Sequence, residues 1–509
     1  MSAAASPIFT DLYQWTMALS YLENKKAHDS AVFEMFFREC PFEGEYAIMA
    51  GHDRIRQVLE SFSLTEKEWS YLESLPELQP SKLQALKPHM HLNDVRVFGI
   101  AEGEPVFSRT PILQVEGPLF KVQLLESALL NAVNFAILCT TYARRIRQVA
   151  PNHKLVEFGL RRAQGPDGAM TATRSAFLGG FDGTSNVLGG MNWGIPVFGT
   201  MAHSFVQSFT SFTDDLLDWN GRSIQDLINK HRPSQPTHQG ELAAFLAYAK
   251  SFPKSSLLLV DTYDAMASGV PNAICTFKIL RELGHTPLGI RLDSGDLVYQ
   301  SKEARRLLDE AGFQSASIFA SNDLSERIIA SLQAQGSAIG GFGVGTHLVT
   351  CKDQPALGAV YKMVEIKNEP RIKISEQTAK ISIPGAKNVY RLVGKDGRYL
   401  LDLMQLASEP PPQPGKAIWA HHPFDPFRKA EVTPSAVIEL LTPLFENGAW
   451  ISKIDLQASK ASSAKSLKLL REDILRRENP TPYKVSLSEN LKETLEHCLK
   501  QEAPRRHLA

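Results

Sequence analysis

An arginine inside an apolar segment is the first feature of this sequence that could do chemistry. Arg291 lies in Gly289-Ile-Arg-Leu-Asp-Ser-Gly-Asp296, whose apolar residues favour a buried strand. Burial of an unpaired guanidinium carries a large free-energy cost, so we expect Arg291 to face an anion. Its fork of N–H groups matches a carboxylate. Arg291 is therefore either a structural partner of an acid such as Asp261 or Asp293, or a residue that binds a substrate carboxylate.

A histidine with hydroxyl neighbours is the second candidate. His203 stands in Gly199-Thr-Met-Ala-His-Ser204, just past a short apolar run. Because neutral imidazole is available near pH 7, His203 could act as a general acid, a base or a nucleophile. A structural histidine is the alternative interpretation. No HExxH motif or similar spacing of histidine and carboxylate predicts a tight metal site made by protein alone.

A glycine-rich segment could hold a phosphate. Gly340-Gly-Phe-Gly-Val-Gly-Thr346 ends a predicted strand in glycines, which let backbone N–H groups approach an anion, and Thr346 adds a hydroxyl donor. The segment is neither a Walker A loop nor a dinucleotide-binding fingerprint. A tight turn without a ligand is the alternative.

Charged residues follow other predicted strands. Arg161 and Arg162 could together hold a polyphosphate, although on an exposed turn they would merely be solvated. Asp261, Asp293 and Asp296 could oppose positive charge or recruit Mg²⁺ bound to a diphosphate, because that ion needs only one or two carboxylates.

These residues follow short apolar runs that alternate with helical stretches. The runs are residues 154–159, 176–180, 196–200, 256–261, 286–292, 317–320, 338–344 and 357–364. Their length, without strict alternation, predicts parallel strands buried on both faces in βα units. Such units can close into a β/α barrel, in which the carboxyl ends of the strands share one face where active sites lie. We therefore expect the polar residues to meet at one face.

The flanking segments predict further α+β layers. Residues 11–22 favour a helix, and residues 95–98 and 111–116 favour strands. Residues 379–401 indicate a hairpin that turns at Asp396-Gly397, before a proline-rich break at 409–414. We expect an N-terminal α+β sandwich domain over 1–118, a connecting helix over 119–150, the β/α barrel over 151–365, and a C-terminal extension over 366–509 that packs on the first two domains.

Composition and charge exclude several classes of protein. Lys+Arg and Asp+Glu both total 55, so no net field would gather nucleic acid or an anionic membrane. Five scattered cysteines without a CxxC pair argue against a disulfide framework and a thiolate zinc site. The long apolar stretch 124–143 contains Glu126, Asn131 and Asn134, which favours a buried helix over a membrane span. Residues 1–7 resemble no secretion signal, so we expect a cytoplasmic protein.

Several motifs together resemble those of nicotinate phosphoribosyltransferases, over nearly the whole chain. They are Thr10-Asp-Leu-Tyr-Gln14 with Met17-Ala-Leu, Phe33-Glu-Met-Phe-Phe-Arg38, Glu157-Phe-Gly-Leu-Arg-Arg162, Gly199 to Ser204, Gly289 to Asp296, Ile383-Pro-Gly-Ala-Lys387, Tyr390-Arg391 and Asp402.

The resemblance implies a type II phosphoribosyltransferase with an irregular α/β barrel, an N-terminal open sandwich and a homodimer whose sites lie near the interface. The implied reaction joins nicotinate to 5-phosphoribosyl 1-diphosphate, giving nicotinate mononucleotide and diphosphate. It is coupled to ATP hydrolysis, is formally that of a ligase, and begins NAD salvage. Mg²⁺ or Mn²⁺ would accompany the phosphates, and ATP is the co-substrate.

The resemblance also implies roles for individual residues. Arg291 would face the nicotinate carboxylate, Tyr13 would offer an aromatic surface to the pyridine, and Thr200 would lie beside that ring. His203 would be phosphorylated transiently. Other residues would surround the ribose and phosphates, namely Arg161, Asp261, Gly343, Gly345, Thr346 and Ser382, the last of which is commonly threonine in the family. Asp293 is the candidate protein ligand of the metal.

Two alternatives stay open. A related enzyme could act on nicotinamide, which lacks the carboxylate that would pair with Arg291, or on quinolinate, which carries two carboxylates and needs a more cationic pocket. A catalytically silent relative could serve in binding or signalling, although the presence of Tyr13, His203 and Arg291 argues against it.

Overall fold

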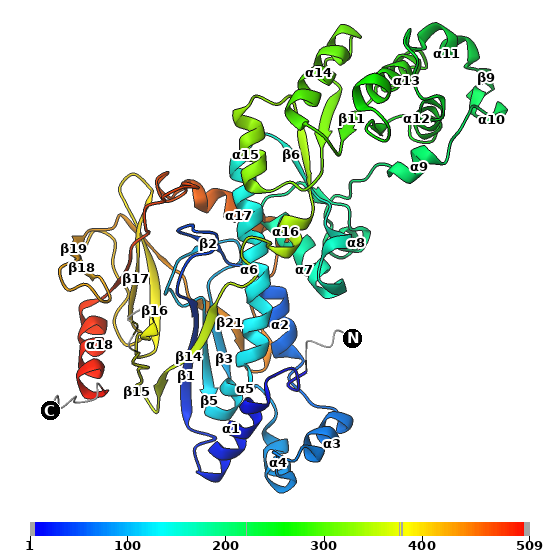
Figure 1. Ribbon diagram of the computed structural model, residues 1–509. Helices are drawn as coiled ribbons and strands as arrows, with labels where there is room; N and C mark the ends of the chain where they lie inside the picture. The colour runs from blue at the N-terminus through cyan, green and yellow to red at the C-terminus, as the bar shows by residue number, and fades with distance from the viewer. Residues whose placement is uncertain (1–5, 220, 376, 378–379, 503–509) are drawn as a thin grey trace, which may run out of the picture. The chain divides into compact units, whose positions relative to one another are not determined.

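The computed structural model describes residues 6–219, 221–375, 377 and 380–502, which form two compact units. The first unit combines the residues up to Thr141 with those from Asp353 onward, and the second unit runs from Tyr142 to Lys352. The boundary falls inside the long helix α6, Glu126–Val149, which confirms the helix expected over 124–143 (Figure 1). No helix in the described part of the chain is both long and apolar enough to span a membrane.

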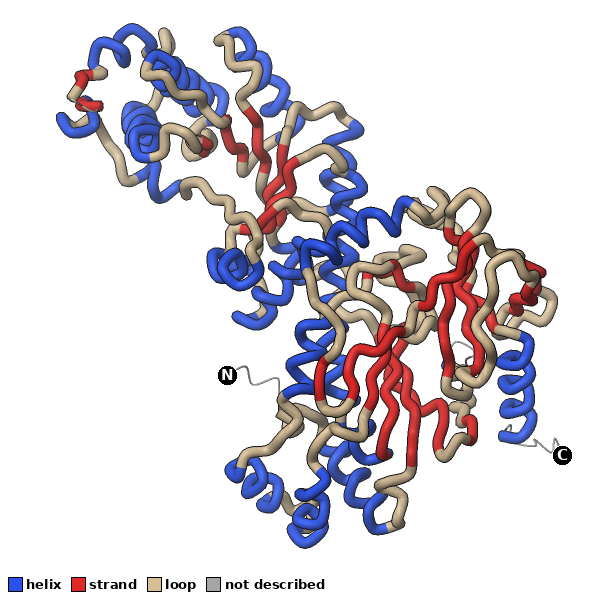
Figure 2. The backbone as a smooth tube through the Cα atoms, turned by 180° about the vertical axis from the view of Figure 1, so that it is seen from behind, coloured by secondary structure: helices blue, strands red, loops and turns tan. Residues whose placement is uncertain are grey.

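The second unit is built on a parallel sheet. Its six strands pair in the order β10-β11-β12-β13-β6-β7, and every pair is parallel. They are β6 (Lys154–Glu157), β7 (Gly183–Thr184), β10 (Leu257–Leu259), β11 (Gly289–Leu292), β12 (Ser317–Ala320) and β13 (Gly341–Val344). Helices alternate with these strands along the chain (Figure 2). The predicted α/β class with an irregular barrel is confirmed, and among the described residues the sheet is an open arc.

The helical elements of this unit connect the strands and extend beyond them. They are η3 (Leu160–Arg162), α7 (Gly165–Leu178), α8 (Val187–Trp193), α9 (His203–Gln207), α10 (Asp214–Leu217), α11 (Gln225–His231), α12 (Gln239–Ser251), the π-helical turn η4 (Ala265–Gly269), α13 (Val270–Glu282), α14 (Leu297–Glu310), α15 (Glu326–Ala334) and α16 (Thr346–Thr350). A small hairpin joins β8 (Asp218–Trp219) to β9 (Arg222–Ser223).

Three of the eight expected strands do not join this sheet. Residues 176–180 form the end of α7 and the turn after it, because a short apolar run fits a buried helix as well as a strand. In the run 196–200 only Val197 makes a bridge, to Thr184. Residues 357–364 do contain a strand, but it lies in the first unit and is antiparallel to its neighbours.

The first unit contains a seven-stranded antiparallel sheet in the order β15-β14-β1-β5-β3-β21-β22. Its strands are β1 (Ser30–Phe37), β3 (Arg96–Gly99), β5 (Leu113–Pro118), β14 (Ala359–Ile366), β15 (Glu369–Pro370), β21 (Thr442–Glu446) and β22 (Ala449–Trp450). The strands expected over 95–98 and 111–116 are thus confirmed. Seven of the eight residues of β1 are buried, and this strand lies in the interior of the sheet between β14 and β5.

Helices of the first unit include the one expected over 11–22. They are α1 (Leu12–Glu23), α2 (His52–Glu60), α3 (Glu66–Ser74), α4 (Pro80–Leu86), η2 (Lys87–His89), α5 (Leu119–Leu124), α17 (Leu456–Lys468) and α18 (Glu489–Glu502). A short ladder pairs β2 (Ala47–Ile48) with β4 (Pro105–Val106). Residues 1–5, from which no secretion signal was expected, lie outside the described residues.

The C-terminal part adds a six-stranded sheet in the order β19-β18-β23-β17-β16-β20. Its strands are β16 (Lys387–Val393), β17 (Tyr399–Leu406), β18 (Ile418–His421), β19 (Lys429–Val432), β20 (Ala436–Glu439) and β23 (Val485–Leu487). The expected hairpin is confirmed as β16 and β17, with Gly397 at a φ of 77° in the turn where glycine is favoured. Residue 379 lies outside the described residues.

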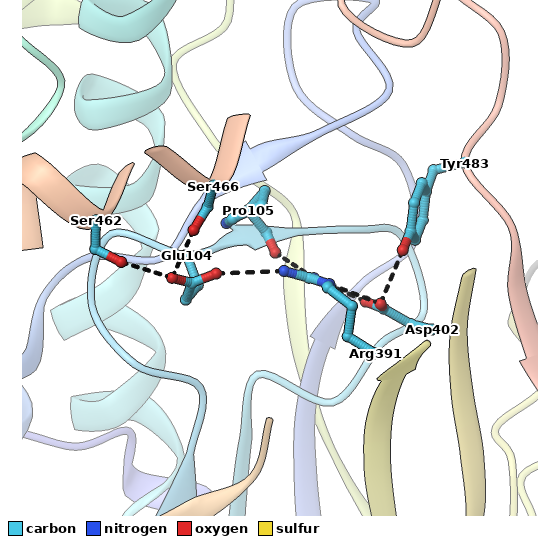
Figure 3. A network of polar contacts seen from close by, with 7 residues as sticks. All are labelled: Glu104, Pro105, Arg391, Asp402, Ser462, Ser466 and Tyr483. Atoms are coloured by element: carbon cyan, nitrogen blue, oxygen red, sulfur yellow. Dashed lines mark hydrogen bonds and ion pairs between the residues drawn. The ribbon is translucent and has the colours of Figure 1, made fainter. Parts of the chain in front are cut away.

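A fully buried arginine ties distant segments of the first unit together (Figure 3). Arg391 donates to both oxygens of Asp402 at 2.9 Å and to the carbonyl of Pro105 at 2.7 Å. Its third nitrogen lies 3.4 Å from Glu104, whose other oxygen accepts bonds from Ser462 and Ser466 on α17. All three nitrogens therefore have partners, which is the condition under which a charge is tolerated in the interior.

We predict that Asp402→Asn lowers the free energy of unfolding by about 3–5 kcal/mol, because it leaves the buried Arg391 charge with Glu104, at 3.4 Å, as its remaining carboxylate partner. Asp396→Asn, in the exposed turn of the same hairpin, is the matched control and should cost under about 1 kcal/mol. Urea unfolding of both variants measures the difference. Equal losses in the two variants would contradict a special role for the buried pair.

Candidate functional site

A cleft of about 670 Å³ lies at the carboxyl ends of the parallel strands of the second unit. Most of the predicted site residues of this unit line it. The lining residues are Phe158, Arg161, Arg162, Ser185, Gly199, Thr200, Met201, Ala202, His203, Leu259, Arg291, Asp293, Ser321, Asn322, Asp323, Gly343, Gly345, Thr346 and Lys352. The tertiary structure therefore gathers residues as far apart in the sequence as Phe158 and Lys352, as expected from the rule that strand carboxyl ends share one face.

Arg291 is partly paired inside the cleft. Its Nη2 donates to Asp293 at 2.9 Å and its Nε donates to Ser321 at 2.8 Å, while Ser321 in turn donates to Asp293. Among the described residues, the third nitrogen, Nη1, has no hydrogen-bond partner. The ring of Phe158 lies 5.5 Å from the guanidinium carbon. Arg291 is thus a structural partner of Asp293, which is one of the two roles that the sequence left open, and its Nη1 donors are not engaged by any described residue.

His203 stands at the first position of the short helix α9. Its Nδ1 lies 3.1 Å from the hydroxyl of Thr262, and its Nε2 lies 3.8 Å from an oxygen of Asp293. The side chain is 41% exposed, so a reactant can reach the ring. A hydroxyl on one nitrogen and a carboxylate beside the other hold the ring in place and leave Nε2 accessible to chemistry.

Asp261 supports the cleft from behind and is absent from its lining. Its Oδ2 accepts from the backbone N–H of Asp293 at 2.8 Å and from Ser294 at 2.6 Å. The residue therefore holds the turn after β11, which carries the carboxylate that pairs with Arg291. Thr200 does line the cleft, and its hydroxyl donates to the carbonyl of Leu257 on β10.

Glycine is required at position 343, near the end of β13, for a packing reason. A Cβ atom at Gly343 would clash with the ring of Phe158, the ring that lies beside Arg291. At Gly345 the nearest atom to such a Cβ would be 3.5 Å away, so a small side chain has room. The absence of a side chain at Gly343 thus leaves the space that the Phe158 ring occupies, a role that the sequence did not reveal.

The cleft carries an excess of positive charge. Four cations line it, Arg161, Arg162, Arg291 and Lys352, against two carboxylates, Asp293 and Asp323. Asp323 lies between Lys352, at 3.8 Å, and His347, at 3.6 Å. Lys352 was not foreseen because it follows α16 rather than a strand. Within a chain whose net charge is zero, this local excess favours an anionic ligand.

Glu157 lies at the end of β6, beneath the cleft, and is 1% exposed. Its carboxylate accepts from the backbone N–H of Gly159 and from the hydroxyls of Thr173 and Thr184. Burial raises the pKa of the Glu157 carboxyl above its ordinary value, and the three hydrogen bonds oppose that rise. The residue fixes the turn that carries Arg161 and Arg162.

Two predicted site residues, Tyr13 and Ser382, belong to the first unit. Tyr13 lies on α1 with 49% of its surface exposed. The hydroxyl of Ser382 accepts from the backbone N–H of Lys373 at 2.9 Å. In the described part of the chain, no group of three or more histidine, cysteine or acidic residues is arranged to hold a metal ion.

Comparison with known proteins supplies the family. Models of nicotinate phosphoribosyltransferases match three successive parts of the chain: the N-terminal domain over residues 8–134, the family over 153–393 and the C-terminal domain over 386–495. Nicotinate phosphoribosyltransferase 2 of Arabidopsis thaliana is 44% identical over 531 residues, covering 98% of this chain and 95% of the relative. The Dictyostelium discoideum nicotinate phosphoribosyltransferase is 42% identical, covering 99% and 90%.

A solved structure agrees with these matches. The crystal structure of human nicotinic acid phosphoribosyltransferase superposes with a TM-score of 0.85 at 37% identity, covering 96% of this chain and 99% of that one. The parallel sheet, with a cleft at the carboxyl ends of its strands, is that of an α/β enzyme. The chain belongs to the nicotinate phosphoribosyltransferase family, and the resemblance seen in its motifs is confirmed.

The raised pKa of Glu157 predicts a pH dependence of stability. The folded chain keeps this proton at pH values where the unfolded chain, with a pKa near 4.5, has released it. The free energy of unfolding should therefore fall as the pH rises from about 4.5 through the raised value. Glu157→Gln should flatten the slope in that window. Denaturant unfolding of both proteins at a series of pH values tests this, and identical slopes would contradict it.

Proposed function

We propose that this protein joins nicotinate to 5-phosphoribosyl 1-diphosphate, forming nicotinate mononucleotide and diphosphate, with ATP hydrolysis coupled to the reaction. The observation that carries the proposal is Arg291, a cation in the cleft with one nitrogen free among the described residues. A nicotinate carboxylate would complete its hydrogen bonding, which a neutral carboxamide could not do with the same charge assistance.

The charge of the cleft suits the rest of the substrate. Arg161 and Arg162 are exposed at its edge, and neither guanidinium has a partner among the described residues. In the proposed reaction, the pyridine nitrogen attacks the anomeric carbon while the bond to diphosphate breaks, and diphosphate takes the electron pair. Cations stabilise that leaving charge, and the cleft walls orient the two reactants.

His203 is proposed to accept the γ-phosphoryl group of ATP, releasing ADP. Its Nε2 is the nitrogen without a hydroxyl partner, and a ring held by Thr262 at Nδ1 is oriented for attack at phosphorus. The charge added to the ring would then change the affinity of the nearby loops for phosphoribosyl diphosphate. Hydrolysis of the phosphohistidine would return the ring to its starting state.

Magnesium or manganese is proposed to enter with the phosphates. Asp293 and Asp323 both line the cleft, and one or two carboxylates suffice for an ion whose other ligands are phosphate oxygens and water. When bound, the ion would neutralise phosphate charge. Asp293 offers one oxygen for this role, because its other oxygen is engaged by Arg291 and Ser321.

A homodimer with sites near the interface is proposed on the basis of the family resemblance. Features of the first unit support a contribution of that unit to an anion site. Arg38, Arg109 and Lys362 are half-buried there without ion-pair partners among the described residues. Burial is the main cause that lowers the pKa values of Arg109 and Lys362. The positive charge of Arg38 lowers both pKa values further, while Glu126 opposes the shift at Lys362. Tyr13 and Ser382 are proposed to serve the pyridine and the phosphates from this unit.

The function itself is tested by one assay. Purified protein receives Mg²⁺, phosphoribosyl diphosphate and one of three acceptors, nicotinate, nicotinamide or quinolinate, with and without ATP. Nicotinate mononucleotide formed from nicotinate, and stimulated by ATP, supports the proposal. Product from another acceptor instead would assign a related enzyme, and no product from any acceptor would favour a silent relative.

We predict that Arg291→Gln raises the KM for nicotinate and reduces the preference for nicotinate over nicotinamide. The reason is that a desolvated bidentate pair between an arginine and a carboxylate contributes roughly 2–4 kcal/mol to binding. Arg281→Gln is the control, since that guanidinium lies 4.5 Å from the Phe313 ring and outside the cleft lining. Steady-state kinetics with both acceptors measure the effect. A folded Arg291→Gln protein with unchanged nicotinate affinity would reduce Arg291 to a structural partner of Asp293.

We predict that His203→Ala abolishes acid-labile labelling by γ-labelled ATP and removes the stimulation by ATP. Slow synthesis from phosphoribosyl diphosphate should continue, because the cleft still orients both reactants. His231→Ala is the matched control, since His231 pairs with Glu282 at 2.6 Å outside the cleft lining, and it should keep the label. Label that persists in His203→Ala would assign the phosphate to another residue.

A further inference from the structure

Five buried side-chain oxygen atoms of the second unit have no hydrogen-bond partner among the described residues, and three of them belong to side chains around the segment that follows β10. These three are Oε1 of Glu241, Oδ1 of Asp261 and Oδ1 of Asn272. Glu241 and Asn272 are both 0% exposed. Because a buried acceptor without a donor is destabilising, native proteins keep few of them, and each one calls for a reason.

The other oxygen of Glu241 joins three helical elements. From α12, its Oε2 accepts from Ser268 at 2.6 Å in the π-helical turn η4 and from Asn272 at 2.9 Å on α13. Ser268 also accepts from the backbone N–H of His238, and Asn272 also donates to the carbonyl of His238 at 3.1 Å. The carboxyl of Glu241 therefore fixes η4 and α13 against the start of α12.

The turn η4 in turn fixes the end of strand β10. Asp264 caps the turn by accepting from the backbone N–H groups of Met266 and Ala267. At its other end, Gly269 packs so closely on the carbonyl of Val260 that a Cβ there would collide with it. Residues 260–269 are thus held as one rigid segment, with a π-helical turn of the kind often found at functional sites.

This segment carries two side chains that hold the cleft. Asp261 accepts from the backbone of Asp293, and Thr262 contacts Nδ1 of His203. Since Asp293 pairs with Arg291, a shift of the segment would move the carboxylate beside the guanidinium as well as the histidine ring.

We propose that Glu241 is a positioning residue of the cleft, which holds residues 260–269 so that Asp261 fixes Asp293 and Thr262 fixes the His203 ring. Glu241 lies outside the cleft lining and acts through the segment alone. The expected effect of Glu241 on the reaction rate rests on the proposed function, whereas its expected effect on the position of the His203 ring does not.

The charge state of Glu241 fits this role. Burial raises the pKa of the Glu241 carboxyl, the carboxylates of Asp261 and Asp264 raise it further, and the bonds from Ser268 and Asn272 oppose the rise. Glu241→Gln keeps an acceptor oxygen for Ser268 and Asn272, and Glu241→Ala removes it.

The test compares Glu241→Ala with Glu241→Gln, and uses Thr276→Val as the matched control. Thr276 is buried on α13 and donates only to the carbonyl of Asn272 one turn earlier, so its loss removes a buried hydrogen bond without touching residues 260–269. Ser268→Ala cuts one bond between Glu241 and the segment and serves if Glu241→Ala does not fold. The His203 ring signal is followed by NMR in protein with labelled histidine and is assigned by its absence in His203→Ala.

We expect Glu241→Ala, and to a smaller extent Ser268→Ala, to shift the His203 ring signal, and we expect Glu241→Gln and Thr276→Val to leave it in place. In the kinetic assay, Glu241→Ala should lower the ATP-stimulated rate about tenfold, in line with the sensitivity of rates to small displacements of reacting groups. The rate without ATP should fall less. Rescue by glutamine distinguishes positioning from a general loss of stability.

Two results would overturn the proposal. One is an unchanged His203 signal in folded Glu241→Ala or Ser268→Ala protein, which would make Glu241 a structural residue only. The other is an equal shift in Thr276→Val, which would show that any loss of a buried bond moves the ring. If the wild-type protein makes no nicotinate mononucleotide, the proposed function fails, while the NMR comparison still decides the role of Glu241.

Discussion

The incomplete pairing of Arg291 is the interaction on which the cleft depends. A guanidinium among apolar residues is tolerated only when its donors are met, and here Asp293 and Ser321 meet those on two of its three nitrogens. Arg391 differs from Arg291, because all three of its nitrogens have hydrogen-bond partners and its side chain is fully buried. A saturated arginine holds a fold together, whereas an unsaturated one in a cleft is ready for a carboxylate.

Much of the second unit follows from keeping Arg291 and Asp293 in place. Asp261 holds the turn after β11, Phe158 covers one side of the guanidinium, and Gly343 leaves room for that ring. Glu157 does the same for the turn that carries the adjacent Arg161 and Arg162, through three hydrogen bonds that its carboxylate accepts. Behind the cleft, buried polar groups thus determine where the exposed ones stand, which is how a site is oriented before a substrate arrives.

The proposed chemistry needs little from acid or base catalysis. Displacement of diphosphate requires an oriented ring nitrogen and cations that receive the leaving charge, and the lining of the cleft provides an excess of cations. In this proposal His203 serves a separate step, the acceptance of a phosphoryl group from ATP. The carboxylate of Asp293 lies beside both Arg291 and His203. One side chain therefore contacts both the residue proposed to bind nicotinate and the residue proposed to react with ATP.

The sequence by itself determined the fold class, the family and most of the cleft. Short apolar runs followed by polar clusters predicted parallel strands, and the rule that their carboxyl ends meet on one face brought Thr200, His203, Arg291 and Thr346 together. Five of the eight runs became strands of that sheet. A run such as 176–180 did not, because a short apolar run fits a buried helix equally well.

Only the tertiary structure decided which partners each charge has. Hydrogen bonds from Ser321 to Asp293, from Gly159 to Glu157 and from Ser268 to Glu241 join residues through directions and distances that periodicity does not encode. Strand 359–366 pairs in an antiparallel sheet for the same reason. An apolar run indicates that a strand is buried, whereas the packing of the whole unit decides which strand lies next to it.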